Sequence, residues 1–138
     1  MKLLIDTNVL MDALSDREPF SEMSTKIVSL CSEQKAEGYF AMHTISTLFY
    51  LLHKYKPAEE IRKDLYDLCR IMRIAYADQD AVMKAIKNDA FRDFEDCLQA
   101  ECAKAVGADY IITRNTADFA DSPVPAVTPA DFLSRFDA

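Results

Sequence analysis

Four aspartates fall at places where apolar sequence gives way to polar sequence. They are Asp6, Asp93, Asp96 and Asp118. Like charges about 4 Å apart repel by about 4 kcal/mol at an effective dielectric constant of 20, so a cluster of carboxylates needs compensation. Mg²⁺ or Mn²⁺ would provide it, because these ions prefer oxygen ligands and keep several waters. Taken singly, each aspartate has an equally simple explanation as a helix cap or turn residue.

Two of these aspartates are predicted to lie at the ends of buried strands. Asp6 directly follows the apolar residues of a predicted strand at 2–5, and Asp118 lies in the loop after a predicted strand at 109–113. In parallel sheets, ligands bind outside the carboxyl ends of the strands. The position of these two residues therefore favours a binding site over two unrelated turns.

The other two aspartates stand at the start of a helix predicted over residues 93–106. Asp93 and Asp96 are three residues apart, so they share a face of that helix. Glu95 lies about 100° round the helix from Asp96 and is expected to point elsewhere. Taken together, the acids favour metal binding.

Strand-like and helical segments alternate along the rest of the chain. Further strands are predicted at residues 39–42, 74–76 and 124–127, and helices at 9–14, 23–31, 44–55, 57–73 and 81–87 and from 128 onward. Alternation of this kind predicts an α/β fold in which helices cover a mainly parallel sheet. No repeat or linker divides the sequence, so we expect a single domain over residues 1–138.

Composition excludes several classes of protein. The 138 residues include 16 Lys+Arg and 23 Asp+Glu, a formal net charge of −7, which argues against nucleic-acid binding through bulk charge. The four cysteines form no Cys-x-x-Cys pair, which argues against a zinc site and fits reduced core residues. No segment is long and apolar enough to span a membrane, and no leader is evident, so we expect a cytoplasmic protein.

Three segments, in this order, resemble successive motifs of PIN domains. They are Asp6-Thr7-Asn8-Val9-Leu10-Met11-Asp12, Asp93-Phe94-Glu95-Asp96-Cys97-Leu98-Gln99 and Thr113-Arg114-Asn115-Thr116-Ala117-Asp118-Phe119. The resemblance spans nearly the whole chain and is closest to bacterial PIN proteins of the VapC toxin type. It implies a three-layer α/β/α fold and a Mg²⁺- or Mn²⁺-dependent ribonuclease activity on RNA. It also implies frequent homodimers and, for toxins, a small antitoxin partner.

The resemblance also assigns roles to individual residues. Asp6 matches the first metal-binding aspartate of the family, Asp96 the acid at the head of the helix, and Asp118 the acid of the closing motif. The residues that match polar positions orienting these acids or the attacking water are Thr7, Asn8, Thr113 and Asn115. Arg114 lies beside the acids in sequence and is expected either to contact phosphate or to balance the charge of Asp118.

One departure from the family pattern concerns the helix after the second strand. Many PIN nucleases carry a Glu there, whereas Thr47 occupies the matching position in this chain. A hydroxyl is a weaker metal ligand than a carboxylate, and Asp93 could restore the fourth acid from another helix. This hypothesis predicts that Asp93→Asn weakens metal binding about as much as Asp96→Asn.

Several other interpretations remain or are excluded. A haloacid-dehalogenase-type phosphatase needs a second Asp where Asn8 stands, and the acid pair and lysine of a response-regulator receiver are absent. The remaining alternative is a PIN-scaffold binding protein that has lost activity. His43 and His53 are expected to be structural or surface residues.

Two surfaces are candidates for partners. The basic side of the helix at 57–73, together with Lys54 and Lys56, could bind RNA, although solvation of a charged face is the simpler explanation. The apolar run 48–52 is expected to pack in the core, with a homodimer face or an antitoxin groove as the alternative.

Overall fold

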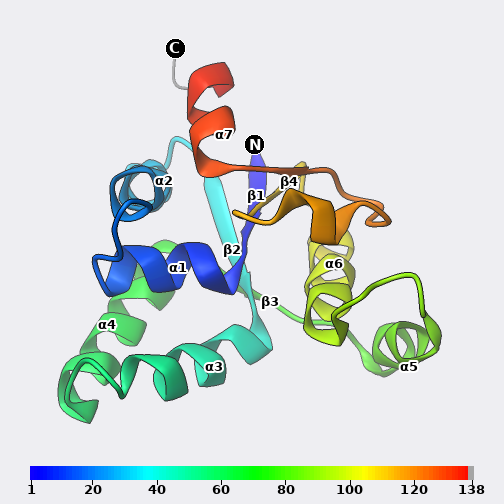
Figure 1. The fold of residues 1–138 in the computed structure, drawn as a ribbon, viewed down its shortest axis with the longest axis horizontal. Coiled ribbons are helices and arrows are strands. Elements are labelled where there is room, and N and C mark those ends of the chain that lie inside the picture. The colour runs from blue at the N-terminus through cyan, green and yellow to red at the C-terminus, as the bar shows by residue number, and fades with distance from the viewer. Residues whose placement is uncertain (137–138) are drawn as a thin grey trace.

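The computed structural model describes residues 1–136 and places five parallel strands in one sheet of order β3-β2-β1-β4-β5. The strands are β1 (Lys2–Ile5), β2 (Glu37–Ala41), β3 (Arg73–Ala75), β4 (Tyr110–Ile112) and β5 (Ala126–Val127). The helices are α1 (Thr7–Leu14), α2 (Ser21–Ser32), α3 (Met42–Leu52), α4 (Ala58–Ile71), α5 (Gln79–Lys87), α6 (Phe94–Val106) and α7 (Pro129–Phe136), with a short 3-10 helix η1 (Thr116–Phe119). Figure 1 shows their arrangement.

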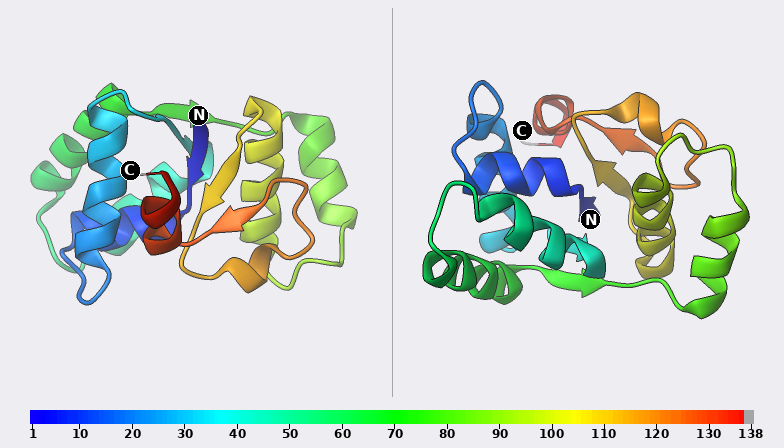
Figure 2. Two further views of the ribbon diagram at one scale, coloured as in Figure 1. Left: turned by 90° about the horizontal axis from the view of Figure 1, so that it is seen from above. Right: turned by 60° about the horizontal axis from the view of Figure 1, so that its bottom comes forward.

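Helices cover both faces of the sheet, so the molecule has three layers. On one face, Leu3 and Ile5 join a core cluster that includes apolar residues of α1, α2, α3, α4 and α7. On the other face, Leu4 packs with Ala100 and Ala103 of α6, and α5 packs against α6. Figures 1 and 2 show α5 and α6 on the opposite side of the sheet from α1 to α4. The alternation along β1 follows from the two-residue period of a strand.

The register of the two central strands places the functional segments side by side. Ile5 of β1 pairs with Ile112 of β4, and the amide of Asp6 donates to the carbonyl oxygen of Ile112 at 2.9 Å. Asp6 and Thr113 therefore leave the sheet at the same edge. The right-hand view of Figure 2, which brings the bottom of the molecule forward, shows α1 and α3 on one side of the sheet and α6 on the other.

The predicted α/β class and the order of elements are confirmed, while several boundaries differ. β2 ends at Ala41 and α3 begins at Met42, one residue inside the strand expected there. α4 ends at Ile71, so Arg73 lies in β3 and leaves the basic side of the helix. Asp93 caps α6 instead of lying inside it. Among residues 1–136, no helix is long and apolar enough to cross a membrane.

Candidate metal-binding and catalytic site

Asp6 is the most buried of the predicted acids, and each of its carboxylate oxygens accepts one hydrogen bond. Thr113 Oγ1 donates to Oδ2 at 2.7 Å, and Gln99 Nε2 donates to Oδ1 at 2.5 Å. Asn115 donates its backbone N–H to Thr113 Oγ1 at 3.1 Å, which leaves the hydroxyl proton of Thr113 for Asp6. Burial raises the pKa of Asp6, and these two hydrogen bonds and the charge of Arg114 oppose that rise.

The start of α6 brings two further carboxylates toward Asp6. Asp93 caps the helix by accepting the backbone N–H of Glu95 at 2.8 Å, and its side chain is exposed. Asp96 lies in the first turn and is half-buried. Burial, followed by the charges of Asp6, Asp93, Asp118 and Glu95, raises the pKa of Asp96 to about 7. The four predicted aspartates are thus near enough for their charges to interact.

Asp118 is held by the short 3-10 helix that follows β4. Its backbone N–H donates to the carbonyl oxygen of Asn115 at 3.0 Å, and the neighbouring Phe119 is buried in the core cluster on the α6 side of the sheet. The Asp118 side chain is half-buried, while Asn115 is exposed. Phe119 therefore anchors the segment that carries Asp118.

Glu95 lies at the site, contrary to the expectation that it would point elsewhere. Thr7 Oγ1 donates to Glu95 Oε1 at 3.4 Å, and the same oxygen lies 3.9 Å from His43 Nε2. Thr7 is also hydrogen-bonded to Thr44 of α3, with 2.9 Å between the two hydroxyl oxygens. Because Asp93 is the cap of α6, Glu95 lies in the first helical turn, and its side chain reaches Thr7 at the start of α1 and His43 at the start of α3.

His43 adjoins the acids instead of standing apart from them. Burial lowers its pKa, and the charges of Glu95 and Asp6 oppose that change. His43 Nε2 is buried and makes no hydrogen bond to any described residue. The imidazole is thus a half-buried neighbour of the candidate site.

Thr47 stands on α3 and uses its hydroxyl within that helix. Thr47 Oγ1 donates to the backbone carbonyl oxygen of His43 at 3.2 Å. A Ser or Thr hydroxyl bonded to the preceding turn is a common local arrangement in helices. The residue at the position of the missing Glu therefore satisfies its own donor locally.

Arg114 pairs with Asp12 of α1, and not with Asp118. Arg114 Nε lies 2.7 Å from Asp12 Oδ2, but these two atoms do not form a hydrogen bond. The hydrogen bond of the pair is donated by Arg114 Nη2 to Asp12 Oδ1 at 3.4 Å. The Asp12 side chain is 0% exposed, and Arg17 Nε lies 3.7 Å from its Oδ1. The guanidinium of Arg114 also stacks on Phe20, with 4.1 Å between Cζ and the ring centroid.

The sequence singled out the four aspartates, whose role as metal ligands stays a prediction, and it did not single out Gln99 or Asp12. Gln99 is 1% exposed and holds Asp6 from α6. It follows Asp96 by three residues, so the helical period that paired Asp93 with Asp96 also pairs Asp96 with Gln99. Asp12 had no comparable signal, because its partner Arg114 lies about a hundred residues further along the chain.

The chemistry of these residues fits a divalent cation that binds oxygen. The donors are carboxylates, and the mutual repulsion that raises the pKa of Asp96 is what a cation would relieve. Two buried side-chain oxygens, Asn8 Oδ1 and Gln99 Oε1, have no hydrogen-bond partner. Within residues 1–136, however, no three His, Cys, Asp or Glu side chains are gathered closely enough to form a ready metal cluster.

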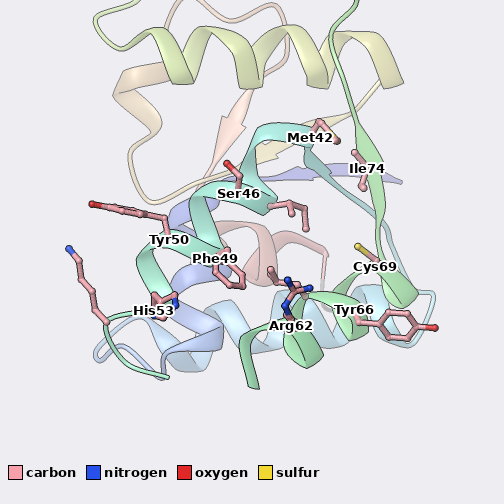
Figure 3. A pocket seen from close by; sticks show the side chains of 12 residues that line it. Met42, Ser46, Phe49, Tyr50, His53, Arg62, Tyr66, Cys69 and Ile74 are labelled. Carbon is pink, nitrogen blue, oxygen red and sulfur yellow. The ribbon is translucent and has the colours of Figure 1, made fainter. Parts of the chain in front are cut away.

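A large cavity lies away from the acids, between α3 and α4. It has a volume of about 970 Å³, and none of the four aspartates lines it. Figure 3 shows the cavity between α3 and α4, with Tyr50, Phe49 and Tyr66 among its lining residues. Its position and apolar lining separate it from the candidate metal site.

Comparison with known proteins indicates the family to which this fold belongs. The family model described as PIN domain matches residues 2–117. Ribonuclease VapC1 of Aquifex aeolicus is 24% identical over 139 residues, with 99% of this chain and 96% of that protein covered.

Solved structures of similar fold include toxin proteins. One is a toxin-antitoxin complex from Klebsiella pneumoniae, with a TM-score of 0.70, 23% identity and 92% of this chain and 97% of that chain covered. Another is VapC20 of Mycobacterium tuberculosis, described as a sarcin-ricin loop cleaving toxin, with a TM-score of 0.62, 12% identity and coverage of 79% and 86%. With a family model matched over most of its length, the chain belongs to the PIN domain family.

Proposed function

We propose that this protein is a metal-dependent ribonuclease of the VapC type, which hydrolyses RNA phosphodiester bonds. The observation that carries the proposal is the group of carboxylates around Asp96, which together with burial raises the pKa of Asp96 to about 7. Perturbed carboxylates of this kind are concentrated at functional sites. Membership of the PIN domain family and the similarity to a relative named ribonuclease support the same activity.

In this proposal Asp6, Asp96, Asp118 and Asp93 hold the metal. Mg²⁺ or Mn²⁺, when bound, supplies an activated water and neutralises charge on the phosphoryl oxygens. Thr7, Asn8, Thr113 and Asn115 are proposed to orient these acids or the attacking water. Thr113 does so through its hydrogen bond to Asp6, and Asn115 through its backbone N–H to Thr113.

Arg114 is proposed to act next to the acids as a fixed positive charge. Its guanidinium contacts Asp12 and Phe20, and the side chain as a whole is 24% exposed. The exposed part of the guanidinium is available to an RNA phosphate, because Asp12 occupies only one edge of it. Of the two roles expected from the sequence, contact with phosphate is the one proposed, since the ion pair of Arg114 is with Asp12 and not with Asp118.

Asp93 is proposed to supply the acid that Thr47 does not. The proximity of the two carboxylates supports this, since the charge of Asp93 is one cause of the raised pKa of Asp96. Asp93→Asn should weaken Mn²⁺ binding about as much as Asp96→Asn does. An unchanged metal affinity in Asp93→Asn would confine its role to capping α6.

A mixed RNA panel tests the proposed activity. The purified protein is incubated with the panel and Mn²⁺ or Mg²⁺, beside Asp96→Asn and beside wild type with a chelator. We expect cleavage by wild type alone. A folded wild-type protein that neither cleaves nor binds Mn²⁺ would favour the alternative, a catalytically inactive PIN-scaffold binding protein, for which the replacement of Glu by Thr47 is the supporting observation.

We further propose that a small antitoxin docks on the cavity between α3 and α4. The lining consists mainly of aliphatic and aromatic residues, with Ser46 and a few basic side chains among them. Two of the aromatic residues, Tyr50 and Tyr66, are 72% and 69% exposed. Lys54 and Arg62 are the charged residues of this lining, on a chain with a net charge of −7. An amphipathic segment with apolar anchors and acidic flanks is therefore complementary to it.

The same family similarity supports a homodimer and action in the cytoplasm. VapC-type proteins form dimers frequently, and an RNA substrate is available in the cytoplasm. Sedimentation of the purified chain, with and without its antitoxin, would establish the oligomeric state.

A further inference from the structure

The Asp6 carboxylate accepts hydrogen bonds from two neutral side chains that belong to different parts of the fold. Thr113 follows β4, and Gln99 comes from the second turn of α6. Both donors are buried, with Thr113 0% and Gln99 1% exposed. Each carboxylate oxygen of Asp6 accepts one of these hydrogen bonds, and each retains lone pairs for other ligands.

The orientation of the Gln99 amide follows from chemistry. An ionised carboxylate only accepts hydrogen bonds, so the NH₂ group of Gln99 must face Asp6 Oδ1 and the carbonyl oxygen must face away from it. That carbonyl oxygen, Oε1, is buried and has no hydrogen-bond partner among residues 1–136. An unpaired buried acceptor of this kind costs free energy unless a ligand or water fills the place beside it.

The position of Gln99 links two of the proposed metal ligands. Gln99 lies three residues after Asp96, so both side chains project from neighbouring turns of the same side of α6. The hydrogen bond from Gln99 to Asp6 therefore fixes the end of β1 relative to the helix that carries Asp96. A change in that bond would alter the relation between the two carboxylates.

We propose that Gln99 is a positioning residue for Asp6, which holds the Asp6 carboxylate in the orientation that binds the divalent cation. The inference rests on the proposed metal site and adds to it a residue outside the set of acids. Partners that orient metal ligands typically change metal affinity by 10–100-fold when they are removed. Gln99 meets that description, since it contacts Asp6 and carries no charge of its own.

Mn²⁺ binding measured by electron paramagnetic resonance, without RNA, tests the proposal. Gln99→Met keeps a side chain of similar length and removes the donor. We expect its Mn²⁺ affinity to fall about 10–100-fold, with thermal unfolding still cooperative. Gln99→Asn is a second variant, in which the amide is one methylene shorter and should weaken Mn²⁺ binding in the same direction.

Cys102→Ala is the matched control. Cys102 is also buried on α6, but it belongs to the apolar cluster around Ala75 and Phe119 and does not contact Asp6. This variant should lose stability and keep its Mn²⁺ affinity. Wild-type affinity in folded Gln99→Met and Gln99→Asn, or an equal loss in Cys102→Ala, would overturn the inference, whereas absence of Mn²⁺ binding in wild type would overturn the proposed metal site itself.

Discussion

Asp96 illustrates how neighbouring charges and burial set the behaviour of one carboxyl group. Its pKa is raised from 3.8 to about 7, first by burial and then by the charges of Asp6, Asp93, Asp118 and Glu95. In the absence of metal, the folded protein therefore keeps a proton on Asp96 at pH values where the unfolded chain has lost it. A cation would reverse this balance, because it competes with the proton for the same oxygens.

The raised pKa of Asp96 makes the stability of the folded protein depend on pH. Between about pH 4 and pH 7, Asp96 binds more protons in the folded state than in the unfolded state, so its contribution to the stability of the metal-free protein falls as pH rises through this window. His43, whose pKa is lowered by burial, contributes in the opposite direction. Burial raises the pKa of Asp6 and Asp12 as well, so Asp96→Asn should reduce this fall without abolishing it. Thermal unfolding in the presence of a chelator, from pH 4 to pH 8, measures how the stability changes with pH. A slope identical in wild type and Asp96→Asn would contradict the assignment.

For single residues, the sequence located the four candidate acids, whose metal binding stays a prediction, but it did not locate their neighbours. The four aspartates could be identified because strand ends and helix starts are visible as changes from apolar to polar residues. Glu95 was misplaced because a helical projection alone does not show which neighbouring helices face the first turn. Gln99 and Asp12 act through partners 93 and 102 residues away, and such contacts leave no local pattern.

At the scale of elements, the ion pair between Asp12 and Arg114 ties α1 to the segment after β4. α1 follows Asp6, and Arg114 directly follows Thr113, so the two elements that carry this part of the site share a buried salt bridge. Phe20, in the loop between α1 and α2, covers the guanidinium from a third segment. The pair therefore belongs to the support of the site, whatever contact Arg114 makes with RNA.

The two halves of this pair should differ in their effect on stability. Arg114→Met leaves the fully buried Asp12 carboxylate with only Arg17 at 3.7 Å, and should cost about 3–5 kcal/mol in the free energy of unfolding. Asp12→Asn leaves partly exposed arginines that water can reach, and should cost about 1–3 kcal/mol. Urea unfolding of both variants measures the difference, and a larger loss in Asp12→Asn would contradict this account.

Element order was predictable, and element ends were less so. Strands and helices could be recognised from the different spacing of their apolar residues, but the predicted end of α4 was two residues late. Arg73 looked like part of the basic face of α4, yet it pairs with Tyr39 as the first residue of β3. Lys56, another residue of the expected RNA surface, is paired with Asp64 at 2.8 Å and Glu60 at 3.9 Å, which reduces the free positive charge there.

Across the whole molecule, the net charge is −7, yet the cavity between α3 and α4 is lined by apolar residues and by the basic Lys54 and Arg62. The cavity and the acid site belong to different parts of the surface, since none of the four aspartates lines the cavity. The sequence indicated an excess of apolar residues in the run 48–52, but not which of them are exposed. Leu48 and Leu52 are 0% exposed, whereas Tyr50 is 72% exposed.

The proposed antitoxin surface predicts which aromatic residues matter for the partner. Tyr50→Ala and Tyr66→Ala should each weaken antitoxin binding about 10-fold, because exposed aromatic anchors commonly contribute more than 1 kcal/mol. Tyr55→Ala is the matched control, since Tyr55 is 65% exposed and does not line the cavity. Titration calorimetry with the antitoxin measures all three. Equal effects in the three variants would place the antitoxin elsewhere.

We propose above that the carboxylates around Asp96 hold the metal on which RNA cleavage depends. The most direct test is the rate of RNA cleavage as a function of Mn²⁺ concentration, for wild type and Asp96→Asn. We predict a wild-type rate that saturates with Mn²⁺ and a variant that needs far more Mn²⁺ or shows no cleavage. Cleavage that persists in chelator, or the same Mn²⁺ dependence in both proteins, would contradict the claim.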